Sequence, residues 1–354
     1  MARVAVDAMG GDFAPRAPVE GALRALAELP DEHTIELVGR SAVVEATLDE
    51  VTAGDGGALA PLRARVSVVE APDVIAMSDK PTAAIRGKPK SSMVVGLRRQ
   101  ADGHNDAFVS AGNTGAQMAA SWFILRGHPG VMRPAIGTIL PTARGRLILL
   151  DSGANVDCSA EELVQFARLG AVYAEDVLGR TDPAVGLLSI GEEPEKGNAA
   201  VIEAHGLLRA EAGLRFLGNV EGRDIPTGEC DRGVIDVVVC DGFVGNVLLK
   251  FYEALAPTLM AVFARALGAE RGTLAEAFKE LDYSEYGGAP LLGVRGVSII
   301  SHGKSTPRAI KNAVKVAVRM VEAQMSEHVG RRLAEAAASA APPPPAPAPA
   351  SSPV

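Results

Sequence analysis

The chain has 354 residues, 47% hydrophobic and 22% charged, an ordinary globular composition with ample material for a large core. Its net charge of −8 and aromatic content of 4% exclude an overall nucleic-acid-binding surface. The three cysteines, Cys158, Cys230 and Cys240, form no CxxC pair, which argues against a disulfide framework and favours a reducing cytoplasm. The longest uncharged stretch, Ala107–Leu125, contains several polar side chains, so we expect no transmembrane helix.

Short apolar runs recur along the chain, each followed by a glycine-bearing turn and then by helical periodicity. This alternation predicts an α/β protein with a mostly parallel sheet. Several runs are apolar throughout, as expected when helices cover both faces of the sheet. The predicted strands are Val4–Val6, Ile35–Val38, Ala107–Ser110, Leu147–Leu150, Val185–Ile190, Arg215–Leu217, Asp236–Cys240 and Val297–Ile300.

Local capping signals predict where three helices begin. Ser159 with Glu162 forms a capping box before a helix that should end at Gly179, and Thr273 with Glu276 forms another. Thr306 followed by Pro307 places a cap residue before proline at the first helical position, and the helix that follows has room to run to about residue 335.

The segment Val247–Leu267 is apolar nearly all round. Such a helix is usually buried in a core, or is broken in two near Pro257. The alternative is a projecting arm at an oligomer or membrane surface, and we favour oligomer packing.

We find no internal repeat and no linker. The sequence therefore predicts one α/β domain over residues 1–337, with a helical arm at about 247–290. Residues 338–354 are rich in alanine and proline without a periodic apolar face, so we predict a disordered tail there.

Seven turns rich in glycine, asparagine and acidic residues follow predicted strands, where open α/β sheets bind ligands. Glycine allows a ligand to approach the backbone, and a helix that begins in such a turn directs free N–H groups at an anion. Any single turn of this kind could simply be a tight turn, but seven at strand ends favour a phosphate or oxyanion site. They are Asp7–Asp12, Ser110–Gly115, Asp151–Asn155, Gly191–Asn198, Gly218–Asp224, Asp241–Asn246 and Ser301–Thr306.

Motifs for other chemistries are missing from the sequence. There is no GxGxxG after the first strand and no complete P-loop, which weakens nucleotide binding. There is no HExxH motif or clustered ligand set, so we expect no metal and no cofactor. There is no GxSxG elbow, which makes a serine acyl-enzyme unattractive.

Three polar residues in these turns are candidates for chemistry, and each has a simpler explanation. Lys196 could hold phosphate or polarise a carbonyl, or could be a solvated lysine paired with Glu192 or Glu193. His302 could donate to phosphate or move a proton, or could be satisfied by backbone groups. Asn246 could donate to a carbonyl oxygen, or could be a helix cap.

A local basic run stands out in this acidic chain. It comprises Lys80, Arg86, Lys88 and Lys90. It could dock an acidic partner or bind phosphate, although a solvated basic loop would look the same.

Taken together, the turns resemble the phosphate acyltransferase (PlsX) family of bacterial phospholipid synthesis. Nine fragments match in order over about residues 1–335, from AVDAMGGD through SAGNTGA, LLDSGAN, GEEPEKGN, FLGNVEGRD and VVVCDGFVGNVLLK to SHGKS. Ser189, where the family pattern suggests asparagine, is a small departure, and the proline-rich tail lies outside the resemblance.

The resemblance implies a Rossmann-like three-layer α/β/α sandwich and a homodimer whose arm touches the membrane from the cytoplasm. It also implies transfer of a fatty acyl group from acyl carrier protein to inorganic phosphate, giving acyl phosphate for a glycerol-phosphate acyltransferase. The carrier protein would be the acidic partner of the basic run. Direct attack by phosphate needs no enzyme nucleophile, so the site would position the reactants and stabilise the oxyanion.

The resemblance suggests Lys196, Asn246 and His302 as catalytic residues. The expected substrate-binding residues are Asp7, Gly10, Gly11, Asp12, Asn113, Thr114, Asn155, Asn219, Glu221, Gly242 and Gly245.

Two rival functions stay open at this point. The related fold suggests an NAD-dependent decarboxylating dehydrogenase, although we find no metal-binding aspartate set or arginine cluster for it. The basic run and apolar arm also suit a non-enzymatic scaffold for acyl carrier protein or membrane.

Overall fold

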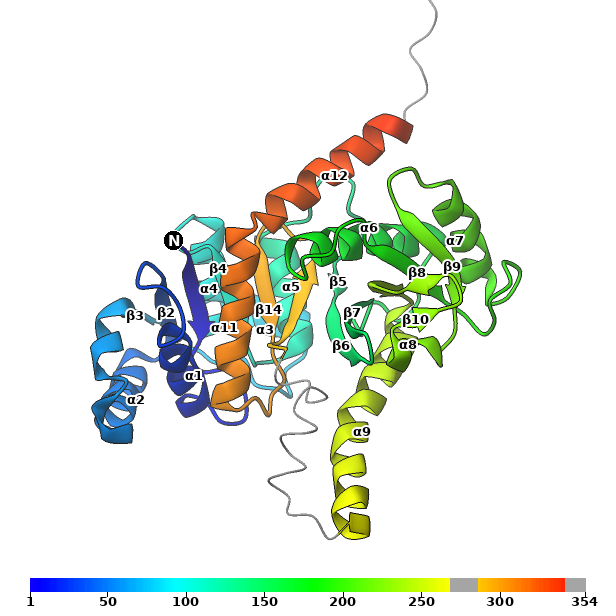
Figure 1. Cartoon of the computed structure of the whole chain (residues 1–354). Coiled ribbons are helices and arrows are strands. Elements are labelled where there is room, and N and C mark those ends of the chain that lie inside the picture. The colour runs from blue at the N-terminus through cyan, green and yellow to red at the C-terminus, as the bar shows by residue number, and fades with distance from the viewer. Residues whose placement is uncertain (268–285, 341–354) are drawn as a thin grey trace, which may run out of the picture.

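The computed structural model describes residues 1–267 and 286–340 and contains two large sheets side by side (Figure 1). The seven-stranded sheet has the order β3-β2-β1-β4-β14-β13-β5, and the five-stranded sheet the order β6-β7-β12-β8-β9. Strands β3 to β14 of the first sheet are parallel, and β13 and β5 pair antiparallel at its edge. In the second sheet only β6 is antiparallel. The prediction of a mostly parallel α/β fold is confirmed.

The strands have the following bounds. In the first sheet they are β1 Arg3–Asp7, β2 Thr34–Gly39, β3 Val66–Glu70, β4 Ala107–Ser110, β5 Ala135–Ile136, β13 Ala289–Leu292 and β14 Val297–Ile300. In the second they are β6 Thr138–Thr142, β7 Gly145–Leu150, β8 Ala184–Leu188, β9 Arg215–Val220 and β12 Val237–Val239. A small hairpin joins β10 Glu229–Cys230 to β11 Gly233–Val234.

The α-helices begin and end as follows: α1 Arg16–Leu26, α2 Ser41–Ala53, α3 Pro81–Gly87, α4 Ser92–Ala101, α5 Thr114–Ile124, α6 Ala160–Asp176, α7 Ala199–Ala210, α8 Asp224–Thr227, α9 Gly242–Leu267, α11 Pro307–Glu322 and α12 Met325–Ala340. Two short 3-10 helices, η1 Asp55–Gly57 and η2 Ala60–Arg65, precede β3.

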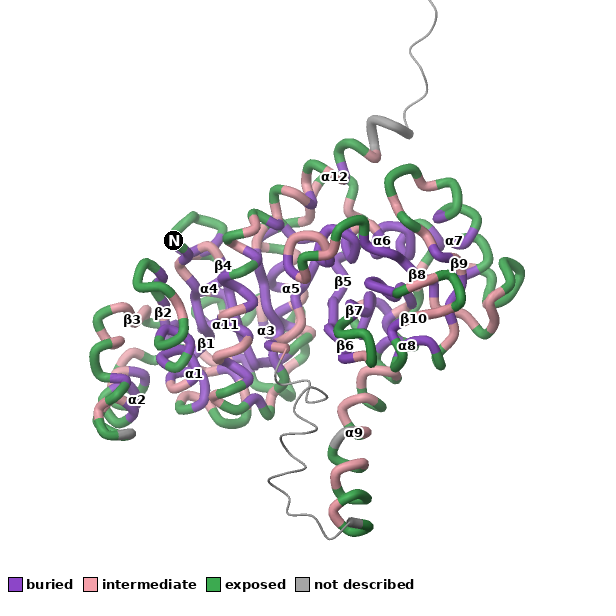
Figure 2. The backbone as a smooth tube through the Cα atoms, viewed as in Figure 1, coloured by how far each residue is buried: buried purple, intermediate pink, exposed green. Residues whose placement is uncertain are grey.

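Alternate residues of the central strand β1 pack on opposite faces of the first sheet, as the two-residue period of a strand requires. Val4 and Val6 belong to the apolar cluster that contains α1 and α11. Ala5 belongs to a second cluster, built from α4 and α5. Helices therefore cover both faces, which gives the three layers. The buried helix α6 extends the first cluster to the second sheet (Figure 2).

The capping predictions agree with the structure wherever it describes the residues. Ser159 and Glu162 form both bonds of the capping box before α6. The Thr306 hydroxyl accepts from the backbone N–H of Ala309 at the start of α11. The pair Thr273 and Glu276 lies outside the described residues.

Two predictions about helices need correction. The helix after Thr306 does not run unbroken to about residue 335, because Gln324 has a φ of 50° and separates α11 from α12. The segment around Pro257 is neither a buried core helix nor a broken one, because α9 is continuous through Pro257. Helix α12 continues to Ala340, past the start predicted for the tail, and residues 341–354 lie outside the description.

Helix α9 projects away from both sheets as a helical arm (Figure 1). Its first turns pack on the second sheet through Leu248, Leu249 and Tyr252, and its outer part is half-buried or exposed (Figure 2). By length and composition alone, Gly242–Ala266 is long and apolar enough to cross a membrane, and its most apolar 18-residue window is not buried. The expectation of no transmembrane helix stays a prediction, although it rested on the longest uncharged stretch and this helix, which contains three charged residues, is a different segment.

Candidate functional site

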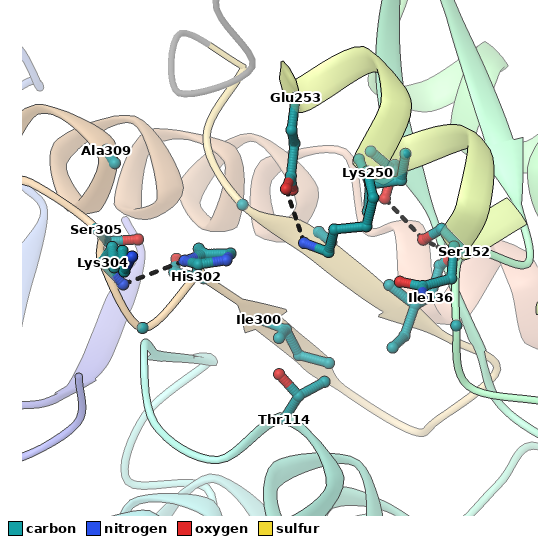
Figure 3. Close-up of a pocket in the computed structure, with 18 of the residues that line it drawn as sticks. Thr114, Ile136, Ser152, Lys250, Glu253, Ile300, His302, Lys304, Ser305 and Ala309 are labelled. Atoms are coloured by element: carbon teal, nitrogen blue, oxygen red, sulfur yellow. Dashed lines mark hydrogen bonds and ion pairs between the residues drawn. The ribbon is translucent and has the colours of Figure 1, made fainter. Parts of the chain in front are cut away.

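A cavity of about 430 Å³ lies where the turns after β1, β4 and β14 face the base of α9 (Figure 3). Its lining includes four residues predicted from the sequence, Asp12, Thr114, Asn246 and His302. The remaining lining residues come from β5, β6, β13, β14, α9, α11 and their adjoining turns, from the segment before α3, and from the turn after β7. The cavity thus lies at the carboxyl ends of the parallel strands of the first sheet.

The turn after β1 is organised by the buried carboxylate of Asp7. Asp7 accepts hydrogen bonds from the backbone N–H of Met9 at 3.1 Å and from the hydroxyl of Ser110 at 2.7 Å. Burial raises the pKa of Asp7, although these bonds act in the opposite direction. Gly10 fits against this carboxylate, since a Cβ there would lie 2.7 Å from an Asp7 oxygen. Asp7 therefore shapes the turn and leaves Asp12 to face the cavity.

The next turn, after β4, depends on Asn113 in a similar way. Its side-chain oxygen caps α5 by accepting from the Ala116 N–H at 3.0 Å. Its amide nitrogen donates to the carbonyls of Met77 and Asp79, both at 3.0 Å. Asn113 thus joins the segment containing Met77 to the start of α5, where Thr114 lines the cavity.

The turn after β14 supplies a cation, Lys304, and an imidazole, His302. His302 Nδ1 accepts from the backbone N–H of Lys304 at 3.2 Å, so in the neutral imidazole the proton lies on Nε2 (Figure 3). Lys304 lines the cavity and makes no ion pair with a carboxylate among the residues that the structure describes. Lys304 lies within the turn Ser301–Thr306 that the sequence singled out, but no role was predicted for it.

The base of α9 is fixed on the buried turn after β7. Asp151 accepts from the backbone N–H of Ile136 at 2.9 Å and from that of Asn155 at 2.6 Å. Asn155 donates its side-chain amide to Asp151 and to Pro134, so it supports this turn and does not line the cavity. Gly242 packs against the same turn, where a Cβ would lie 2.7 Å from an Asp151 oxygen. A Cβ on Gly245 would overlap the Asp151 carbonyl oxygen.

This packing turns one side of α9 toward the cavity. Asp241 caps the helix by accepting from the Val244 N–H at 2.8 Å, so Asn246 is not the cap residue and its side chain is free of that role. One turn further on, Lys250 pairs with Glu253 at 2.7 Å, and both line the cavity (Figure 3). Both charged residues are visible in the sequence of the helix, but the sequence did not predict that they face the cavity.

The turns after β8 and β9 of the second sheet lie apart from the cavity lining, whereas the segments after β7 and β12 contribute Ser152, Gly153 and Asn246 to it. Asn219 is fully buried, bonds to His205 Nδ1 at 2.9 Å and donates to the Glu193 carbonyl at 2.7 Å. Glu221 pairs with Arg223 at 2.6 Å. Lys196 is exposed beside Gly191 and is not among the residues that line the cavity. The structure therefore does not bring Lys196, Asn219 and Glu221 together with Asn246 and His302 in this cavity.

The basic run lies beside the cavity on and around α3. The Lys88 ammonium is bonded to Asp79 and to the carbonyl of Val74, so it holds its own loop. Lys80, Arg86 and Lys90 belong to no ion pair within the described residues. The basic run is close to the cavity lining, because Pro81 would touch a Cβ placed on Gly115, and Gly115 directly follows the lining residue Thr114.

One cluster with metal-ligand types occurs in the described residues, at Glu32, His33 and Glu322. Glu32 and His33 precede β2 and Glu322 ends α11, so the cluster lies at the sheet edge opposite the cavity. His33 Nδ1 already accepts from the backbone N–H of Ala2 at 3.0 Å, which places the neutral ring's proton on Nε2, toward Glu322 at 3.3 Å. A ligating histidine would donate from its second nitrogen, so this geometry favours a hydrogen bond over a metal.

The architecture defines the class of protein. Two solved structures share the fold. The EutD phosphotransacetylase from Staphylococcus aureus has a TM-score of 0.60 and 14% sequence identity, and the match covers 90% of this chain and 94% of that one. A phosphotransacetylase from Streptococcus pyogenes has a TM-score of 0.59 and 16% identity, and the match covers 91% of this chain and 94% of that one. The fold is thus that of phosphotransacetylases.

Sequence comparison is more specific. Residues 2–328 match the model of a family described as fatty acid synthesis protein. The phosphate acyltransferase of Heliobacterium modesticaldum is 49% identical over 341 residues, covering 92% of this chain and 97% of the relative. That of Desulforamulus reducens is 48% identical over 331 residues, covering 91% and 94%. The chain belongs to the phosphate acyltransferase family, and neither rival function is supported.

Proposed function

We propose that the protein transfers a fatty acyl group from an acyl carrier protein thioester to inorganic phosphate, within the cavity at the base of α9. The observation that carries this proposal is the cationic turn after β14. His302 and Lys304 lie there beside the start of α5, where Thr114 adds a hydroxyl. Cations and a helix N-terminus are the groups that bind phosphate in proteins.

The reaction we propose is direct displacement. A phosphate oxygen attacks the thioester carbonyl carbon, a tetrahedral oxyanion forms, and the C–S bond then breaks to release the carrier thiol. Lys304 and the Nε2–H of His302 hold the phosphate, and the side-chain amide of Asn246 donates to the carbonyl oxygen. The attacking hydrogen phosphate loses its proton as the new C–O bond forms, and this proton goes to the departing sulfur, so the carrier leaves as a thiol and His302 keeps its charge.

The cysteines support displacement without an acyl-enzyme. Cys158 and Cys240 lie near the base of α9, where each is positioned by the Asp151 turn. Burial raises the pKa of Cys158 to about 12, and burial also raises that of Cys240. Both thiols are therefore protonated at neutral pH, and a protonated thiol is a poor nucleophile.

Lys196 stays a candidate as a second positive donor. Its loop is held by Asn219 and by the hydroxyl of Ser189, which donates to the Lys196 carbonyl at 2.9 Å. In this proposal Asn219 positions the loop and Glu221 orients Arg223, while Asp7, Asn113 and Asn155 support the turns that form the cavity.

The basic run is a suitable dock for the acidic carrier protein. Lys80 and Lys90 flank α3 and Arg86 lies in its last turn, near the Thr114 side of the cavity, and electrostatic attraction of this kind speeds association. Lys88 contributes by holding the loop through Asp79.

The projecting arm suits a homodimer and contact with the cytoplasmic face of a membrane. Phe243, Val247 and Phe251 recur every four residues on α9 and are each more than half exposed, so they form one apolar stripe. Membrane contact would bring the acyl phosphate close to a glycerol-phosphate acyltransferase, which we propose as the consumer.

The test is to incubate purified protein with acyl carrier protein thioester, with and without phosphate, and to follow free thiol and acyl phosphate. We expect both products in equal amounts and only with phosphate. Tight binding of the thioester without phosphate-dependent thiol release would refute the proposal and favour a scaffold.

A further inference from the structure

The cavity has two chemically different walls. One is formed by the turns after β1, β4 and β14 and carries Asp12, Thr114, His302 and Lys304. The other is formed by β5, β6, the start of β13 and the base of α9, and includes Ile136, Ile139, Leu249 and Ala289. A ligand that fills this space must be polar at one end and apolar at the other.

Apart from Asn246, which the proposed reaction assigns to the thioester carbonyl, the hydroxyl and charged groups of the second wall have partners within the protein. Ser152 donates its hydroxyl to the Ile136 carbonyl at 2.9 Å. Because that hydroxyl has a single proton, Thr138, at 2.7 Å from it, must be the donor in their mutual bond. Lys250 is paired with Glu253 (Figure 3). This wall therefore offers few free donors to a polar ligand, and contact with hydrocarbon leaves no hydrogen bond broken.

We infer that the second wall holds the hydrocarbon chain of the acyl group, and that Leu249 and Ala289 set the preferred chain length. This inference rests on the proposed acyl transfer. The two residues approach the cavity from different elements, α9 and β13, and both are half-buried at its lining.

The size of the cavity limits what it can enclose. A methylene group takes up roughly as much space as a water molecule, about 30 Å³. The 430 Å³ available must hold phosphate and the thioester as well as the chain. The cavity thus has room for a chain of about ten carbons beside the head group, and the end of a longer chain must extend beyond it. A larger side chain at Ala289 should then penalise long chains and spare short ones.

The experiment uses the full chain and a series of acyl carrier protein thioesters from about six to eighteen carbons, with kcat/KM measured at saturating phosphate. We expect Ala289→Leu to lower kcat/KM at least tenfold for the long chains and to leave the shortest within about twofold, since a few methylenes in an apolar pocket are worth that much. Leu249→Ala should shift the optimum the opposite way, toward longer chains. It also keeps the inference testable if Ala289→Leu fails to fold.

The matched control is Leu207→Ala, which truncates a leucine on the outer side of α7 with 40% of its surface exposed. It should leave the chain-length profile unchanged. Equal losses at every chain length in both cavity variants, with intact folding, would overturn the inference. Absence of phosphate-dependent thiol release by the unmodified protein with every chain would instead refute the proposed function, so the two failures are distinguishable.

Discussion

The carboxyl edges of the two sheets carry turns of nearly the same composition but use them differently. In the first sheet, the polar groups of Thr114, His302 and Lys304 face a cavity. In the second, the segments after β7 and β12 also reach this cavity, but near the end of β9 Asn219 is bonded to His205 and Glu193, and Glu221 to Arg223. Glycine and asparagine at a strand end thus indicate a tight, polar turn, but the hydrogen-bond partners decide whether that turn binds a ligand or supports the fold.

The largest loss of activity should come from removing Lys304, the unpaired cation at the carboxyl edge of the first sheet within the described residues. We expect Lys304→Ala to lower kcat/KM for phosphate by about 100-fold or more, because a preorganised charge near the reacting phosphate is lost. Steady-state kinetics with varied phosphate measures this. Lys315→Ala, which removes a lysine paired with Glu28, is the control and should be near normal. Equal losses in both variants would mean that Lys304 has no special role.

The packing of α9 on the second sheet joins the two regions, and Gly245 permits it. Gly245→Ala should destabilise the fold by about 1–3 kcal/mol, because the added Cβ overlaps the Asp151 carbonyl and forces α9 away. Thermal unfolding measures the change. Gly206→Ala in α7, where a Cβ would meet nothing within 4 Å, is the control and should be neutral or slightly stabilising. An unchanged unfolding temperature for Gly245→Ala would show that this close contact is not required.

Substitution of Lys196, at the carboxyl edge of the second sheet, should lower kcat/KM less than substitution of Lys304. We expect Lys196→Ala to lower kcat/KM by about tenfold or less, because Lys196 lies outside the cavity lining and can act only as a supplementary donor. The same kinetic assay applies. A loss larger than that of Lys304→Ala would reverse the comparison and place the phosphate site at the second sheet.

The smallest effect concerns pH and the loop that carries Met77. The hydrogen bond from Lys88 lowers the pKa of Asp79. A lowered pKa means that the carboxylate stabilises the fold above its unfolded pKa of about 3.9, and that this stability is lost as pH falls through the lower folded value. Asp79→Asn should therefore reduce the unfolding temperature slightly at pH 7 and leave it unchanged at strongly acidic pH. A difference that persists in acid would rule out the ionised pair as the cause.

Local signals in the sequence were sufficient for much of the fold. Ala107–Ser110 and Val297–Ile300 were predicted with their observed bounds because each is an apolar run between polar turns. The antiparallel strands β13 and β5 were missed, because β13 contains Pro290 and β5 has two residues, and their pairing depends on distant partners. The break at Gln324 was missed because no glycine marks the positive φ.

The candidate site was less predictable for a geometric reason. An amide in a turn can face a ligand or close its own turn, and the sequence did not distinguish Asn246, which lines the cavity, from Asn155, which does not. The roles of Lys250 and Glu253 depend on which side of α9 faces the cavity, and that is set by Gly242 and Gly245 packing on the Asp151 turn. Lys304 had a signal, since it follows a strand-end histidine and precedes a capped helix.

Direct phosphate binding tests the central claim that the free cations at the edge of the first sheet form the phosphate site. Isothermal titration of inorganic phosphate should give saturable binding to the unmodified protein and to Lys196→Ala, and at least tenfold weaker binding to Lys304→Ala. Undiminished binding to Lys304→Ala together with lost binding to Lys196→Ala would contradict the account.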